Sequence, residues 1–120
     1  AKPQAIVRSN HEYRMSTRRE KIEAMLAEEP GDEFLRYSLA MELDKEGDND
    51  RSLDLLTELI ESEPPYVPAF FMSAKQLIQL GRTEEARAAL RDGIEQARSQ
   101  GDQHAASEMS EFLTALGNHP

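Results

Sequence analysis

Apolar residues recur every three or four positions through most of the chain, which is the spacing of amphipathic α-helices. The clearest case is the segment 50–62, where Leu53, Leu56 and Ile60 fall on one helical face. This pattern predicts helices over residues 17–28, 33–46, 50–62, 67–80, 84–99 and 103–116. The alternation of polar and apolar residues that marks a half-buried strand is not found between turn signals. We therefore predict an all-α fold.

Helix start signals agree with these segments. Thr17 and Glu20 have the three-residue spacing of a capping box. Asp32, Thr83 and Asp102 stand directly before three other helices and are expected to cap them. The connections are only about two to four residues long, and short connections place successive helices antiparallel.

Two pairs of helix-breaking residues share one spacing. Pro30 and Pro64 lie 34 positions apart, and so do Gly47 and Gly81. Proline lacks an amide N–H and disfavours helix in the residue before it, so each proline separates two helices. Glycine adopts positive φ without a steric penalty, so each glycine marks a tight turn. The shared register predicts a helix–turn–helix repeat of this length.

The repeat resembles the tetratricopeptide repeat family, whose pattern is W-x₂-L-G-x₂-Y, then A-x₃-F, then P. The first repeat reads Arg36-x₂-Leu39-Ala40-x₂-Leu43, then Ser52-x₃-Leu56, then Pro64. The second reads Phe70-x₂-Ser73-Ala74-x₂-Leu77, then Ala86-x₃-Leu90. The small residues in these patterns suit close approach of helices.

Three positions depart from the family pattern. Arg36 replaces an aromatic residue, and Leu59 replaces a small one. Arg98 stands in place of the second repeat's closing proline, so we expect that helix to run on toward Gly101. The resemblance covers residues 17–116, with 17–30 as the second helix of a preceding half-repeat. The helix over 103–116 would be a terminal capping helix.

The resemblance implies a right-handed solenoid of antiparallel helix hairpins, in which the first helix of each repeat lines a concave groove. The groove residues would be Phe34, Tyr37, Met41, Asp44, Phe71, Lys75 and Ile78. This face is unusually apolar, and exposed apolar patches mark binding surfaces. We therefore predict a protein–protein interaction module that binds a peptide or helix there, with Asp44 and Lys75 setting the register of the bound segment at the rim.

Other fates of this face stay open from the sequence. The sixth helix or residues 1–14 could cover it, or two copies could bury it in a homodimer. A carboxylate clamp, known from one subtype of the family, is not expected. Tyr37, Met41 and Met72 occupy positions where that subtype would need polar or basic residues.

Charge is distributed unevenly over the 120 residues, whose formal net charge is −9. Residues 1–19 carry five basic side chains and one acidic one, whereas residues 20–120 carry 9 basic and 22 acidic ones. An acidic body repels phosphate backbones, so nucleic acid is not an expected partner. Residues 1–16 are predicted to be a disordered leader, and 117–120 a tail. No apolar run has the length of a membrane span, and we expect a cytoplasmic protein.

The sequence gives little support for a catalytic or metal-binding role. The chain has no cysteine, so disulfides and thiolate ligands are excluded. His104 and Glu108 are spaced i, i+4 on a helix, but two ligands are too few for a structural metal site. Glycine-rich phosphate loops and a nucleophile–His–acid set are not found. We expect no enzyme activity, no cofactor and no bound metal.

Overall fold

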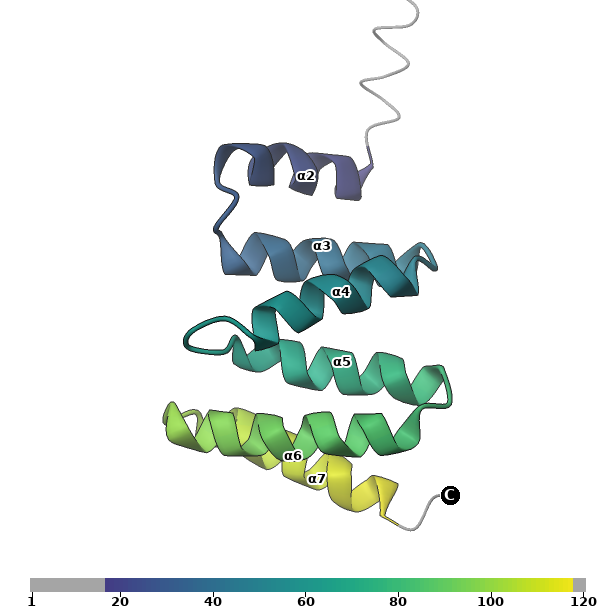
Figure 1. Cartoon of the computed structure of the whole chain (residues 1–120), viewed down its shortest axis with the longest axis vertical. Helices are drawn as coiled ribbons and strands as arrows, with labels where there is room; N and C mark the ends of the chain where they lie inside the picture. The colour runs from purple at the N-terminus through teal and green to yellow at the C-terminus, as the bar shows by residue number, and fades with distance from the viewer. Residues whose placement is uncertain (1–16, 118–120) are drawn as a thin grey trace, which may run out of the picture.

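The computed structural model describes residues 17–117, so the predicted leader and most of the tail lie outside the described residues. The helices are α2 (Arg18–Glu28), α3 (Glu33–Lys45), α4 (Asn49–Ile60), α5 (Val67–Gln79), α6 (Thr83–Ser99) and α7 (Gln103–Leu116). They stack as successive antiparallel hairpins, with α2 at one end and α7 at the other (Figure 1). The described part contains no strand, and the prediction of an all-α chain is confirmed.

The predicted capping box is present at the start of α2. The Glu20 amide donates to Thr17 Oγ1 at 3.0 Å, and the Thr17 amide donates to Glu20 Oε1 at 2.8 Å. Asp32 and Asp102 also cap their helices as expected. The expectation for Thr83 is wrong, because Thr83 is the first residue of α6 and Arg82 is its N-cap, without a side-chain hydrogen bond.

The tight turns explain where these caps fall. Gly47, Gly81 and Gly101 have φ of 86°, 78° and 79°, and the residue after each glycine is the next N-cap. The amide of that residue donates to a carbonyl five positions earlier, for example Arg82 to Leu77 at 2.8 Å. The backbone of the turn thus fixes the cap position, whatever side chain stands there. For the same reason α4 begins at Asn49, after Asp48, and not at residue 50.

The core runs along the stack as three successive clusters. Ile22, Leu39 and Leu43 form the first, between α2 and α3. The second joins α3, α4 and α5, and the third, which is the largest, joins α5, α6 and α7. Each helix packs on its neighbours in sequence, and α5 also contacts α7. The result is an elongated molecule of 63 × 30 × 20 Å.

The small residues that the repeat pattern predicted lie where neighbouring helices approach closely, as expected. Ala40, Ala74 and Ala86 are fully buried, and so is Ser52. Ser52 Oγ donates to the Ala40 carbonyl at 2.6 Å and accepts from Gln76 Nε2 at 2.8 Å. A small polar residue therefore links α3, α4 and α5 through hydrogen bonds that alanine would not make.

The departures from the repeat pattern have local consequences. The helix without a closing proline does run on, because α6 has 17 residues where α4 has 12. Arg36, which replaces an aromatic residue, forms an ion pair with Glu58 on α4.

Arg87 of α6 donates to the Gly117 carbonyl at 3.2 Å and so ties the end of α7 to α6.

Candidate functional site

A cleft of about 280 Å³ lies between the first helices of successive repeats, α3 and α5, and the last helix, α7. It is lined by Tyr37 of α3; by Val67, Pro68, Phe71, Met72 and Lys75 of α5; and by Asp102, His104, Ala105, Glu108 and Met109 at the start of and along α7. The lining combines apolar side chains with a few charged ones, which is typical of ligand and peptide sites.

The α3 side of the cleft is formed by Tyr37, whose ring is held by an aromatic neighbour outside the lining. The rings of Tyr37 and Tyr66 lie 5.6 Å apart between centroids, at an interplanar angle of 55°. Tyr66 is the N-cap of α5, so the pair joins the first repeat to the second. Burial raises the pKa of the Tyr37 phenol, with a further contribution from Tyr66. Burial also raises the pKa of Tyr66, followed by the negative charges of Glu33 and Asp32.

The α5 wall is built around Phe71. Its ring meets Phe112 of α7 edge to face, with centroids 5.2 Å apart and an angle of 68°. Lys75 Nζ lies 4.1 Å from the Phe71 centroid, within cation–π range. These contacts hold Phe71 in place and keep the Lys75 charge at the edge of the cleft. Helix α7 therefore covers part of the face that the sequence predicted as open groove.

The α7 wall carries acidic groups. Asp102 and Glu108 line the cleft opposite Lys75 of α5. His104 Nε2 lies 3.6 Å from Glu108 Oε1, and the His104 side chain is well exposed. Within the described residues, no group of three or more acidic or His side chains is placed to hold a metal ion. The cleft thus offers an apolar floor with a cation on one side and carboxylates on the other.

The structure divides the seven predicted groove residues. Tyr37, Phe71 and Lys75 meet in the cleft, whereas Phe34 lines a different cleft beside α2. Asp44 accepts a hydrogen bond from Asn49 Nδ2 at 2.9 Å, in the turn between α3 and α4.

The remaining two predicted residues do not line the cleft. Met41 is half-buried on α3, and Ile78 packs against the cluster of α5, α6 and α7. The set predicted as one continuous face is therefore distributed over several environments.

Sequence reasoning assigned no α7 residue to the cleft. It left open that this helix could cover the groove face, but His104, Ala105 and Glu108, which line the cleft, were not among the predicted groove residues. A signal for this role exists in the sequence. Ser110 and Gly117 lie 36 positions after Ala74 and Gly81, so α7 follows the pattern of the first helix of a third repeat.

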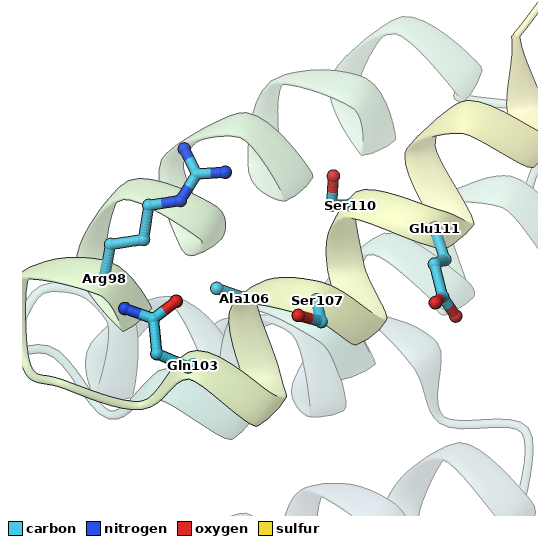
Figure 2. Close-up of a pocket in the computed structure, with 6 residues that line it drawn as sticks. All are labelled: Arg98, Gln103, Ala106, Ser107, Ser110 and Glu111. Carbon is cyan, nitrogen blue, oxygen red and sulfur yellow. The ribbon is translucent and has the colours of Figure 1, made fainter.

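The outward face of α7 does have the polar character of a cap. A second cleft of about 210 Å³ lies between α6 and α7, and Figure 2 shows Arg98 of α6 facing the side chains on α7. Its α7 residues are Gln103, Ala106, Ser107, Ser110 and Glu111. A polar outer face is what the end of a repeat stack requires, because this face stays in contact with solvent.

Comparisons with known proteins agree with this architecture. The tetratricopeptide repeat family model matches residues 45–119. A TPR repeat-containing protein of Pseudomonas aeruginosa is 31% identical over 97 residues, which are 81% of this chain and 92% of that protein.

Two solution structures are also similar. A tetratricopeptide repeat domain protein from Salinibacter ruber has a TM-score of 0.72 and 35% identity, over 76% of this chain and 92% of that one. A protein from Bordetella parapertussis has a TM-score of 0.71 and 31% identity, over 85% and 89% of the two chains. The fold is thus that of a helical-repeat protein. This chain belongs to the tetratricopeptide repeat family.

In the described part of the chain, no helix has the length and apolarity that crossing a membrane would require.

Proposed function

We propose that this chain is a non-catalytic protein-interaction module that binds a peptide or helix of another protein in the cleft between α3, α5 and α7. The cleft itself carries the proposal. It joins aromatic and Met side chains from three helices, and such side chains suit adaptable contacts with polypeptides. Membership of a family of interaction modules supports the same class of function.

The charges of the cleft indicate which segments it prefers. Asp102 and Glu108 on α7 would pair with a basic side chain, and Lys75 on α5 with an acidic one. The net charge of −9 adds a general attraction for basic partners and raises their association rate. The preferred segment therefore has an apolar side chain for the floor and a Lys or Arg beside it.

Site-specific crosslinking tests the proposal in the cells that make the protein. A photo-crosslinking residue at Lys75, in the cleft, is expected to capture a partner protein. The same residue at Arg91, which is exposed on α6 outside the cleft, is the matched control. Mass spectrometry of the captured segment should find an apolar residue close to a basic one.

The outcome also separates the proposal from its main alternative, a homo-oligomer that buries the same face. Crosslinks from Lys75 to a second copy of the chain would favour that alternative. Equal capture at Lys75 and Arg91 would show that the cleft is not the binding site. Lys75→Glu is preferable to a change at Phe71 as a follow-up, because Phe71 packs on Phe112 and its loss would also disturb the fold.

A further inference from the structure

The two ends of the helical stack are chemically different. At one end, α7 follows the pattern of a first helix with no second helix after it in the described residues, and its outward face is polar (Figure 2). At the other end, α2 is a second helix with no described first helix before it (Figure 1). A polar face can remain in contact with solvent without a partner, so the open question concerns the α2 end.

The α2 end exposes apolar side chains in a cleft of about 210 Å³. We call this cleft the α2 seat; it is lined by Arg18, Lys21, Ile22 and Met25 of α2 and by Phe34, Leu35 and Ser38 of α3. Phe34 is 65% exposed and Met25 48%. Among the described residues, Leu80 is the only other large hydrophobic side chain with comparable exposure.

The repeat itself shows what shape fits the α2 seat. A shift of 34 positions takes Ile22 and Met25 to Leu56 and Leu59, and takes Leu35 to Ala69. Leu56, Leu59 and Ala69 are buried in the cluster that includes Ala40 and Tyr37 of α3. One repeat further along, α3 fills the equivalent place and runs antiparallel to α4, the helix that follows it. The lining of the α2 seat therefore suits a helix that runs antiparallel to α2.

The charges along α2 favour a second copy of this helix as the occupant of the α2 seat. Lys21, Met25 and Glu28 follow one another along the exposed side of α2, so this side runs from basic to acidic. When two copies of α2 lie antiparallel about a point between Ala24 and Met25, Lys21 of each copy comes opposite Glu28 of the other. The alternative occupant within the chain is the segment 1–14, which has three basic residues and one acidic residue. It would bring like charge to Lys21, which has no carboxylate partner among the described residues, whereas Arg18 is paired with Glu42 at 3.2 Å.

We propose that two copies of this chain associate through the α2 seat, as a two-fold symmetric dimer with antiparallel α2 helices. Met25 lies near the axis, and Phe34 of each copy packs on the aliphatic stems of Arg18 and Lys21 of the other. A two-fold contact is self-complementary, and the basic-to-acidic order along α2 has this property.

The size of the surface sets the expected affinity. Helix α2 has 11 residues, which is about 16 Å of helix. A contact centred on one such helix falls below the roughly 1,200 Å² of a standard interface and forms weak complexes. We therefore expect dissociation in the micromolar to millimolar range. The cleft between α3, α5 and α7 stays open in this dimer, which would present two copies of it and bind paired targets with avidity.

Sedimentation equilibrium of the full chain over a concentration series up to about 1 mM tests the dimer. The expected result is a mass that rises from 13.6 kDa toward twice that value. Met25→Glu should raise the dissociation constant at least about tenfold, because it places a charge in the apolar centre. Leu80→Glu is the matched control and should leave the constant unchanged, since Leu80 is 43% exposed and lies outside the seat.

Charge reversal tests the antiparallel register independently of folding. Lys21→Glu and Glu28→Lys should each weaken the dimer, whereas the double variant should recover it, because the pair is re-formed with its signs exchanged. A chain that stays monomeric throughout the series would overturn the proposal. So would a dimer that persists with Met25→Glu but is lost with Lys75→Glu, because that dimer would use the other cleft.

Discussion

At the scale of single residues, Gln76 is an unusual member of the core. Its side chain is 1% exposed, and Nε2 donates to Ser52 Oγ at 2.8 Å. Its Oε1 atom has no hydrogen-bond partner among the described residues. A buried polar atom without a partner costs stability. The side-chain amide of Gln76 therefore has a partner for Nε2 but none for Oε1, and the partner of Nε2 is Ser52.

This dependence gives a double-mutant prediction. Ser52→Ala should lower the free energy of unfolding by about 1–3 kcal/mol, because Gln76 Nε2 then loses its acceptor inside the core. Gln76→Leu should stay within about 1 kcal/mol of the parent protein, since leucine removes the unpaired oxygen along with the hydrogen bond. Chemical denaturation measures both values.

The double variant should be more stable than Ser52→Ala alone. Ser107→Ala, at an exposed serine of α7, serves as the control for replacing a hydroxyl. Additive losses in the double variant would contradict the coupling between the two residues.

Gly93 is required for packing and not for a turn. It lies buried within α6, and a Cβ atom there would fall 2.6 Å from Phe70 Cβ and 2.7 Å from Met109 Sδ. Its equivalent in the first repeat is Leu59, where the family pattern prefers a small residue. Phe70 of α5 and Met109 of α7 thus approach α6 at the one position that has no side chain.

Gly93→Ala should therefore destabilise the protein by about 1–3 kcal/mol, as overpacking of a dense core does. Part of the penalty is offset by the better helix propensity of alanine. Gly31→Ala is the control, because a Cβ at Gly31 would meet nothing within 4 Å. Thermal unfolding compares the two variants, and equal melting temperatures would show that α6 can move away from its neighbours.

At the scale of helices, the Tyr37–Tyr66 pair connects α3 to the start of α5, and Tyr37 lines the cleft. The folded state raises the pKa of both phenols, chiefly through burial. A raised pKa means that the neutral phenol is favoured in the folded protein. The stabilising contribution is therefore complete below the unfolded-state pKa of about 10 and is lost as pH rises through the higher folded-state values.

We expect the free energy of unfolding to fall as the pH is raised above about 10. Tyr37→Phe should reduce this alkaline loss, because phenylalanine keeps the ring contact and cannot ionise. Denaturant unfolding at a series of pH values measures the effect, and absorbance near 295 nm follows the phenolate directly. An identical pH profile for the variant would show that Tyr37 ionises as freely in the folded state as in the unfolded one.

At the scale of the whole molecule, stability comes from contacts between successive helices. Repeat proteins of this kind have stabilities close to a sum of local and nearest-neighbour terms. Helix α2 contacts α3 and belongs to the smallest core cluster, whereas α5 and α6 lie within the largest. The stack is therefore weakest at its α2 end.

Hydrogen exchange should reveal this gradient at low protein concentration. Amides of α2 should exchange first, and those of α5 and α6 last, because local opening costs least where the fewest apolar contacts are broken. Mass spectrometry of peptic fragments gives the order. At concentrations that favour the proposed dimer, protection should increase in α2 and stay unchanged in α6. Uniform protection along the stack would contradict the gradient.

The order, type and approximate bounds of the helices could be predicted because their signals are local. Periodic apolar residues, Thr17 with Glu20, and the glycines at 47 and 81 act within a few positions of the chain. The fixed spacing of 34 residues added the register of the repeat, and the comparisons confirm the family. The error at Thr83 arose within one turn, where backbone geometry outweighed side-chain preference.

The sequence by itself thus determined the helices, their antiparallel order and the repeat to which they belong. Only the tertiary structure decided that Phe34 faces the α2 seat while Tyr37 faces the cleft with Phe71, although Phe34 and Tyr37 are one helical turn apart. It also decided that α7 forms a wall of that cleft. The physical reason is that a shared surface depends on the distances and angles between helices. Contacts such as Gly93 with Phe70 and Met109 set these, and the periodicity of a single helix does not contain them.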